Sequence, residues 1–82
     1  MGLRGYVFIK LDEGMDSTQS MELIRKIGNM KEVVLVDDVA GNYDMVALID
    51  APVTIKSVVE KISAMPGVSS VQHCQVIKTS EF

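Results

Sequence analysis

The feature that most constrains the fold of this 82-residue chain is an internal repeat offset by 35 residues. The matching positions are Lys26 with Lys61, Ile27 with Ile62, Met30 with Met65, Val33 with Val68, and Val36 with Val71. In both copies the repeat aligns the end of a predicted helix, a turn and the start of a predicted strand, as two βαβ halves would. Two such halves interlock as a split βαβ, an antiparallel sheet with both helices on one face.

Local patterns predict the same order, βαββαβ. Segments rich in β-branched and aromatic residues, bounded by Gly, Asp and Asn, predict strands over 6–11, 33–36, 43–50 and 68–78. The first helix is predicted to begin at Asp16 or Ser17, with Gln19 in a capping-box position, and to end near Gly28. The second is predicted to begin at Pro52, a residue tolerated in a first helical turn, and to end before Pro66-Gly67. Its apolar residues follow helical spacing closely: Ile55, Val58, Val59 and Ile62.

Alternation along the first three strands leaves both faces of the sheet apolar. The expected division places Val7, Ile9 and Leu11 opposite Tyr6 and Phe8, Val33 and Leu35 opposite Val34 and Val36, and Tyr43, Met45, Ala47 and Ile49 opposite Val46 and Leu48. Two helices cover only one face. Because burial contributes about 25 cal/mol per Å² of apolar surface, we predict that a second subunit covers the other face, giving a dimer through the sheets.

Composition narrows the class of protein. The net charge of −3 disfavours direct binding to nucleic acid or an anionic membrane. A lone cysteine, Cys74, excludes an intrachain disulfide. The longest apolar run, 45–49, is too short to cross a membrane, and residues 1–6 lack the apolar stretch of a signal peptide. We expect a single domain spanning 1–82 in the cytoplasm.

Few residues have the spacing of a catalytic or metal site. His73 and Cys74 are adjacent, but neighbours on a strand point to opposite faces, and no second His completes a zinc site. Asp37, Asp38 and Asp50 fit solvated strand ends, and no nucleophile–base–orienter arrangement is visible. We therefore expect no metal, no cofactor and no catalytic residue.

The segment Gly41-Asn42-Tyr43-Asp44 is the strongest candidate for a binding site. A permissive loop delivers an aromatic ring and a carboxylate to the start of an apolar strand. Loop N–H groups bind carboxylates and an Asp pairs with an ammonium, which together complement a free amino acid. The alternative from the residues alone is a turn closed by an Asx hydrogen bond, with Tyr43 as a packing residue.

Five short motifs occur in a distinctive order: Tyr6-Val7-Phe8-Ile9-Lys10, Glu13-Gly14, Glu32-Val33-Val34, Gly41-Asn42-Tyr43-Asp44 and Met65-Pro66-Gly67-Val68. In this order and spacing, the stretch from 6 to 78 resembles the effector-binding (RAM) domain of the leucine-responsive regulatory protein/AsnC (Lrp/AsnC) family. The resemblance implies an α+β, ferredoxin-like plait that dimerises through its sheets, with dimers closing into rings and a small-molecule effector, typically an amino acid, bound where dimers meet.

The same resemblance implies the residues of the effector site. They are Gly41, Asn42, Tyr43 and Asp44 in the loop, and Ser69, Val71 and His73 on the last strand, where family members often carry small hydroxyl residues. Full-length members also carry a helix-turn-helix, whereas this chain resembles the stand-alone RAM proteins. The implied function is a module that modulates transcription regulation without its own DNA-binding domain, with full-length regulators as candidate partners.

Two other classes stay open. One is a small αβ-plait enzyme that uses Asp44 or His73 in proton transfer, which burial of His73 would weaken. The other is an assembly-only module with no ligand. The sequence leaves the effector, the ring size and the partner regulator open.

Overall fold

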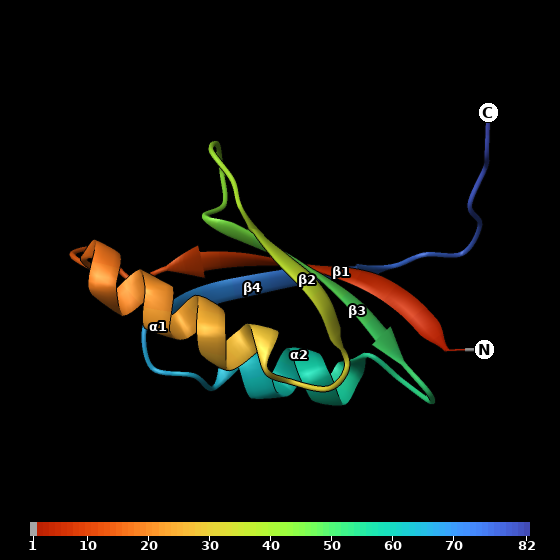
Figure 1. The fold of residues 1–82 in the computed structure, drawn as a ribbon, viewed down its shortest axis with the longest axis horizontal. Coiled ribbons are helices and arrows are strands. Elements are labelled where there is room, and N and C mark those ends of the chain that lie inside the picture. The colour runs from red at the N-terminus through yellow and green to blue at the C-terminus, as the bar shows by residue number, and fades with distance from the viewer. Residues whose placement is uncertain (1) are drawn as a thin grey trace.

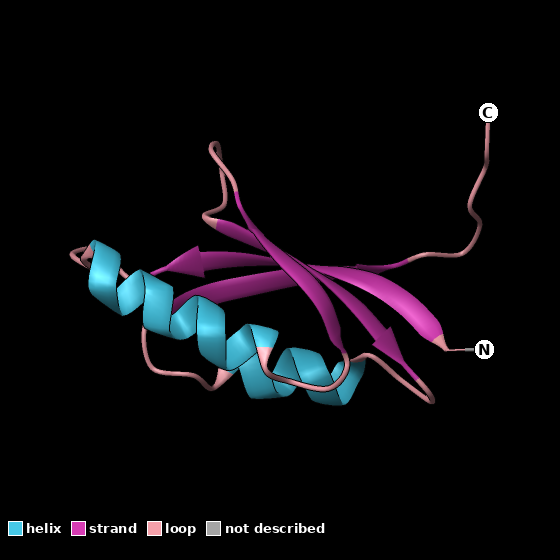
Figure 2. Cartoon of the chain, viewed as in Figure 1, coloured by secondary structure: helices cyan, strands magenta, loops and turns pink. Residues whose placement is uncertain are grey.

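The structure is a computed structural model that describes residues 2–82. Its elements are β1 (Leu3–Leu11), α1 (Ser17–Gly28), β2 (Val33–Asp38), β3 (Met45–Ala51), α2 (Lys56–Ser63) and β4 (Val68–Gln75), shown in Figures 1 and 2. The predicted order βαββαβ is confirmed. The 35-residue repeat aligns the end of α1 with that of α2, and the start of β2 with that of β4.

The four strands form one antiparallel sheet in the order β2-β3-β1-β4. The first strand of one half therefore lies between the two strands of the other half. Both helices lie on the same side of the sheet (Figure 1). This arrangement is the ferredoxin-like plait that the sequence predicts.

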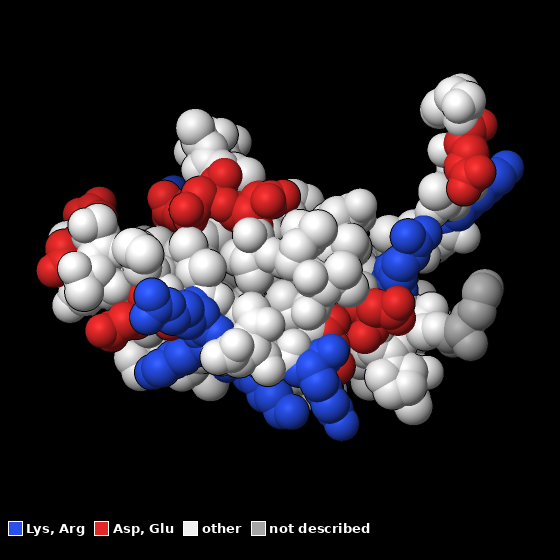
Figure 3. Space-filling view, viewed as in Figure 1, with Lys and Arg blue, Asp and Glu red and all other residues white. Residues whose placement is uncertain are grey.

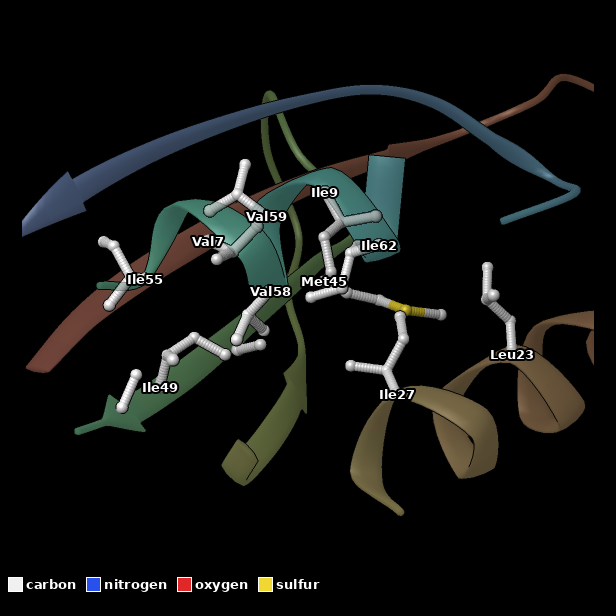
Figure 4. Close-up of a cluster of buried hydrophobic side chains, with 12 residues drawn as sticks. Val7, Ile9, Leu23, Ile27, Met45, Ile49, Ile55, Val58, Val59 and Ile62 are labelled. Carbon is white, nitrogen blue, oxygen red and sulfur yellow. The ribbon is translucent and has the colours of Figure 1, made fainter. Parts of the chain in front are cut away.

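The core fills the space between the helices and one face of the sheet, which we call the covered face (Figure 4). Its buried side chains come from β1, β3, both helices and the residue before α2: Val7, Ile9, Leu23, Ile27, Met45, Ala47, Ile49, Ala51, Ile55, Val58, Val59 and Ile62. The four apolar positions predicted for the second helix are all in this list. The opposite face, which we call the open face, carries no helix.

The beginning of α1 agrees with its sequence signal. Asp16 is the N-cap residue: its Oδ1 accepts the Gln19 N–H at 2.8 Å, and the Gln19 Oε1 accepts the Asp16 N–H at 3.1 Å. This capping box satisfies two of the backbone donors that a helix start leaves free. At the other end, the Asn29 N–H donates to the Arg25 carbonyl at 2.9 Å.

The prediction that the second helix begins at Pro52 is wrong, because α2 begins at Lys56. β3 continues to Ala51, which pairs with Leu3, so Pro52 has to turn the chain away from the sheet. The Thr54 Oγ1 then accepts the Lys56 N–H at 3.1 Å, at the start of the helix.

The predicted division of β2 between the two faces is also wrong for Leu35 and Val36. The pairing with β3 shifts between Val33 and Leu35, so that Leu35 lies opposite Leu48 and Val36 lies opposite Ala47. An extra residue of this kind is a β-bulge, and it reverses the alternation that follows. Val33 and Val36 therefore pack against the core, whereas Leu35 lies on the open face, 45% exposed.

Five strand ends differ from their predicted positions, among them the end of β2 at Asp38 rather than 36 and the end of β3 at Ala51 rather than 50. β1 begins at Leu3 rather than 6, since it pairs with the end of β3. β4 ends at Gln75 rather than 78, although the Val76 N–H still donates to the Arg4 carbonyl at 2.8 Å. β3 begins at Met45 rather than 43, which removes Tyr43 from the alternation assigned to that strand.

Candidate functional site

The Gly41–Asp44 loop connects β2 to β3 at the end of the sheet where β1 stops. Gly41 has φ of +129°, a conformation that glycine adopts without strain. The Asp44 N–H donates to the Ile9 carbonyl at 2.9 Å, and the Asp44 carbonyl accepts the Val39 N–H at 3.0 Å. Together these bonds fix the position of Asp44 beside the last residues of β1.

The Asp44 carboxylate has a structural partner. Its Oδ2 accepts the Leu11 N–H at 2.8 Å, which extends the pairing of β1 past its last ladder bond with β3. This is a bond to a neighbouring strand and not the Asx turn considered from the sequence. The side chain is exposed, so a carboxylate held in a fixed direction also remains accessible to an external cation.

Tyr43 lies on the opposite side of the sheet from the position predicted for it. Its ring packs against Phe8, with the ring centroids 5.4 Å apart and the planes tilted by 44°. Phe8 pairs with Val46 and alternates with the buried Val7, so both aromatic rings belong to the open face. The prediction that Tyr43 shares a face with Met45 is wrong, because Tyr43 precedes the strand and escapes its alternation.

A hollow of about 320 Å³ lies beside Asp44. It is lined by the end of β1, the turn that follows and the first half of α1: Lys10, Leu11, Asp12, Glu13, Gly14, Met15 and Ser20, together with Asp44. Lys10, Asp12 and Ser20 are site residues that no sequence motif predicted. In the sequence, only the Glu13-Gly14 motif marked a part of this wall. The fold brings that turn against the Asp44 loop.

The last-strand candidates lie on β4, across β1 from the Asp44 loop. Val71 pairs with Ile9 and packs against the core, and His73 pairs with Val7, so both point to the covered face. Ser69 falls in an irregularity, since Val68 pairs with Leu11 and Ser70 with Lys10.

His73 lines a second hollow of about 320 Å³, together with Thr54, Ile55, Lys56, Cys74 and Gln75. Within one chain, therefore, the candidate residues do not meet in a single pocket: Asp44 lines one hollow and His73 another. His73 is exposed, so the burial that would have weakened the enzyme hypothesis is not found.

The open face carries one row that is apolar across the whole sheet and a second that is apolar on its two middle strands. One row of paired residues crosses all four strands, and it consists of Leu35, Leu48, Tyr6 and Cys74. The next row consists of Asp37, Val46, Phe8 and Gln72. In the first row Tyr6 is 39% and Leu35 45% exposed, so apolar side chains of one continuous row are open to solvent.

Within residues 2–82, no group of three or more His, Cys, Asp and Glu side chains is arranged to hold a metal ion. Neither of the helices formed by these residues is long and apolar enough to cross a bilayer.

No protein-family model and no curated protein sequence matches this chain. Solved structures do match it. An AsnC family transcriptional regulator from Agrobacterium tumefaciens superposes with a TM-score of 0.84 at 12% identity, over 99% of this chain and 54% of the regulator. The chain has the fold of about half of an AsnC family regulator.

Two further neighbours show the same fold at different lengths. The transcriptional regulator NMB0573 of Neisseria meningitidis, solved with L-methionine, gives a TM-score of 0.77 at 17% identity, over 99% of this chain and 53% of the regulator. Protein TTHA0845 of Thermus thermophilus gives 0.76 at 19% identity, over 98% of this chain and 99% of that protein. The chain thus spans about half the length of these two transcriptional regulators, but nearly all of the Thermus protein.

Proposed function

We propose that this chain is an oligomeric effector-binding module of the Lrp/AsnC type, which binds a small molecule and modulates transcription regulators. The observation that carries the proposal is the fold match over nearly the whole chain to transcriptional regulators, one of the AsnC family and another solved with L-methionine. The sequence motifs Gly41–Asp44 and Met65–Val68 support it independently of the fold. Because the named neighbours are regulators, we propose a non-enzymatic role.

The first step of the proposed mechanism is dimerisation through the open face. Leu35, Leu48 and Tyr6 form an apolar row there, and the tilted pair of Phe8 and Tyr43 adds aromatic surface. A second copy that covers this face removes apolar area from water at about 25 cal/mol per Å². Isologous contacts of this kind are the commonest route to homodimers.

The second step is binding of an amino acid. Asp44 supplies an oriented carboxylate for the effector's ammonium, and the loop N–H groups from Gly41 to Tyr43 are donors for its carboxylate. His73 lines a separate hollow from this loop within one chain, and Ser69 lies on β4, across β1 from it. We infer that the complete site combines the Asp44 loop of one copy with the last strand of another, where dimers meet in a ring.

The binding of an effector at contacts between dimers links ligand to assembly. A ligand that bridges two copies stabilises the assembly that contains the bridge. The chain would then act on full-length Lrp/AsnC-type regulators by joining or leaving mixed assemblies, without contacting DNA itself.

An assembly-only module is the second candidate. It is favoured by the bond between the Asp44 carboxylate and the Leu11 N–H, since this gives Asp44 a structural reason to be present. The two candidates differ in whether any amino acid raises the melting temperature.

The experiment is a thermal-shift screen of the twenty amino acids, followed by calorimetry with the best one on wild type and Asp44→Asn. The amide oxygen can still accept the Leu11 N–H, so the loop should remain in place. A charge-assisted hydrogen bond contributes about 1.5–3 kcal/mol. At about 1.4 kcal/mol per tenfold, Asp44→Asn should weaken binding by roughly tenfold to a hundredfold.

Asp50→Asn is the matched control, because it removes the same charge on an exposed residue at the other end of β3. It should leave the affinity within about twofold, the size of a small surface effect. Equal affinities for wild type and Asp44→Asn would remove Asp44 from the site, and no shift with any amino acid would favour the assembly-only module.

A further inference from the structure

The hollow beside His73 has one wall from α2 and one from β4. The first wall is the start of α2 with the two residues before it, and the second is the last three residues of β4: Thr54, Ile55 and Lys56, and His73, Cys74 and Gln75. Its volume of about 320 Å³ lies at the lower end of the roughly 300–1,000 Å³ that is typical of ligand pockets. The hollow therefore has room for a small ligand.

The two walls meet because Gly5 of β1 has no side chain. Gly5 pairs with Gln75 and so lies beside this end of β4. A Cβ atom at Gly5 would lie 2.6 Å from the Ile55 Cδ1 and 2.7 Å from the Cys74 carbonyl oxygen, too close to both. Without it, Ile55 packs against β1 and is buried, which holds its neighbours Thr54 and Lys56 next to β4. The hollow is thus set by packing of the core.

The side chains that line the hollow are rich in hydrogen-bond donors. Lys56 carries an ammonium group, His73 has at least one ring N–H, and Gln75 has an amide NH₂. The Thr54 Oγ1 accepts the Lys56 backbone N–H at 3.1 Å, which leaves the Thr54 O–H free to donate to another group. Of the residues that the structure describes, no Asp or Glu lines this hollow.

The position of Lys56, rather than its charge alone, makes it a candidate. Basic and acidic side chains both occur along the helical side of the molecule (Figure 3). On α2, Glu60 follows Lys56 by one turn, and Lys61 follows Glu60. Glu60 can approach the Lys56 ammonium, but such exposed pairs contribute little. Lys56 differs from Lys61 because it lines a hollow together with donors from a second element.

We propose that this hollow binds a small oxyanion, either a carboxylate or a phosphate. Lys56 supplies the opposite charge, and His73, Thr54 and Gln75 supply further donors. Charge-assisted hydrogen bonds to these anions are shorter and stronger than neutral ones. The net charge of −3 repels anions from the molecule as a whole, so the affinity has to come from these local contacts.

The site goes beyond the proposed function because it needs one chain only and does not use Asp44. β4 lies across β1 from the strand that follows the Asp44 loop, and the two hollows share no lining residue. The proposal gives His73 a role within its own chain, besides the contact with another copy proposed above.

An amide NMR titration of the isotope-labelled, deuterated protein tests the site. The probes are inorganic phosphate and, separately, acetate, each added at constant pH and at an ionic strength held constant with NaCl. We expect saturable shifts of the Lys56, His73 and Gln75 signals, with a dissociation constant of about 1 mM for the better probe. Shifts that fail to saturate with either probe would show an adventitious ion only and would overturn the proposal.

Substitutions in each wall test whether both contribute. Lys56→Gln keeps most of the side chain and should weaken binding of the better probe by at least about tenfold, because it removes the charge. His73→Ala, at an exposed position, should weaken binding by about threefold. Unchanged affinity in either variant would overturn a site built from the two walls.

Lys61→Gln is the matched control, because it removes the same charge from an exposed residue of the same helix that does not line the hollow. It should leave the affinity within about twofold. Equal weakening by Lys56→Gln and Lys61→Gln would indicate a diffuse effect of charge and reject the site.

Asp44→Asn separates this site from the proposed effector site. It should leave the affinity for phosphate and acetate within about twofold, even if no amino acid binds the protein. Loss of the anion in Asp44→Asn would assign it to the effector site and contradict the proposal. Tighter binding of phosphate than of acetate would point to a phosphate ester as the ligand, and the reverse order to a carboxylic acid.

Discussion

The covered and open faces of the sheet are built from alternate residues of the same strands, yet they meet different surroundings. On β1, Val7 and Ile9 are fully buried, whereas Tyr6, the residue before Val7, is 39% exposed. Met45 and Ile49 on β3 are fully buried as well. Both faces are apolar in sequence, so the pattern of a strand indicates that each face is buried but not what buries it. The helices of the same chain bury one face, and we propose that a second copy buries the other.

The largest expected effect is on the covered face. Ile9→Ala deletes buried methyl groups at a site that both helices help to enclose. Such a change costs about 2–5 kcal/mol, a large part of the roughly 5–15 kcal/mol that stabilises a typical domain. Urea unfolding should show this loss at every protein concentration. A loss that disappears in dilute solution would mean that Ile9 contributes through a partner rather than through the helices.

The neighbouring residue should behave differently. Phe8→Asp places a carboxylate on the open face, where it costs little in a monomer but is expensive in a dry interface. We expect a folded protein by circular dichroism, with dimer association weakened at least about a hundredfold in sedimentation equilibrium. A variant with unchanged mass would show that the open face is not the dimer surface.

The smallest expected effect on stability is at the β-bulge in β2, where neighbouring residues lie on different faces of the sheet. In the monomeric Phe8→Asp background, Val36→Ala should lower the free energy of unfolding by about 1 kcal/mol, because Val36 packs against the core. Leu35→Ala should change it by less than about 0.5 kcal/mol, since Leu35 lies on the uncovered side. Strict alternation along the strand predicts the reverse order, so one pair of denaturation curves distinguishes the two registers.

The sequence predicted the elements whose signals are local. The Asp16–Gln19 capping box and the helical spacing in α2 depend on residues within two turns of each other, and both are confirmed. The errors arose where a distant strand decides the outcome. Pairing of Ala51 with Leu3 extends β3 up to Pro52, where the helix was expected to begin. The shifted pairing of β2 with β3 places Leu35 on the open face.

The candidate site follows the same division. Local residue types were enough to predict the loop at Gly41 and the candidate residue Asp44. They were not enough to predict the wall formed by Asp12 and Ser20. Nor did the sequence show that His73 lies in a separate hollow, because that depends on the register of β4 against β1. A motif identifies residues, whereas the fold decides their distances.

The strand order β2-β3-β1-β4 has a consequence for how the chain is made. Neither half of the repeat can form a sheet from its own two strands. β1 pairs with β3 and β4, both of which are synthesised after it, and it does not pair with β2. A nascent chain that has emerged only to residue 40 would have a capped helix but no paired strand. Native pairing has to wait for β3, and β1 gains its second neighbour only with β4, so folding should be late, cooperative and limited by long-range closure. By the same reasoning, a chain cut in the loop between β2 and β3 should yield two fragments that are each unfolded alone and that fold when mixed.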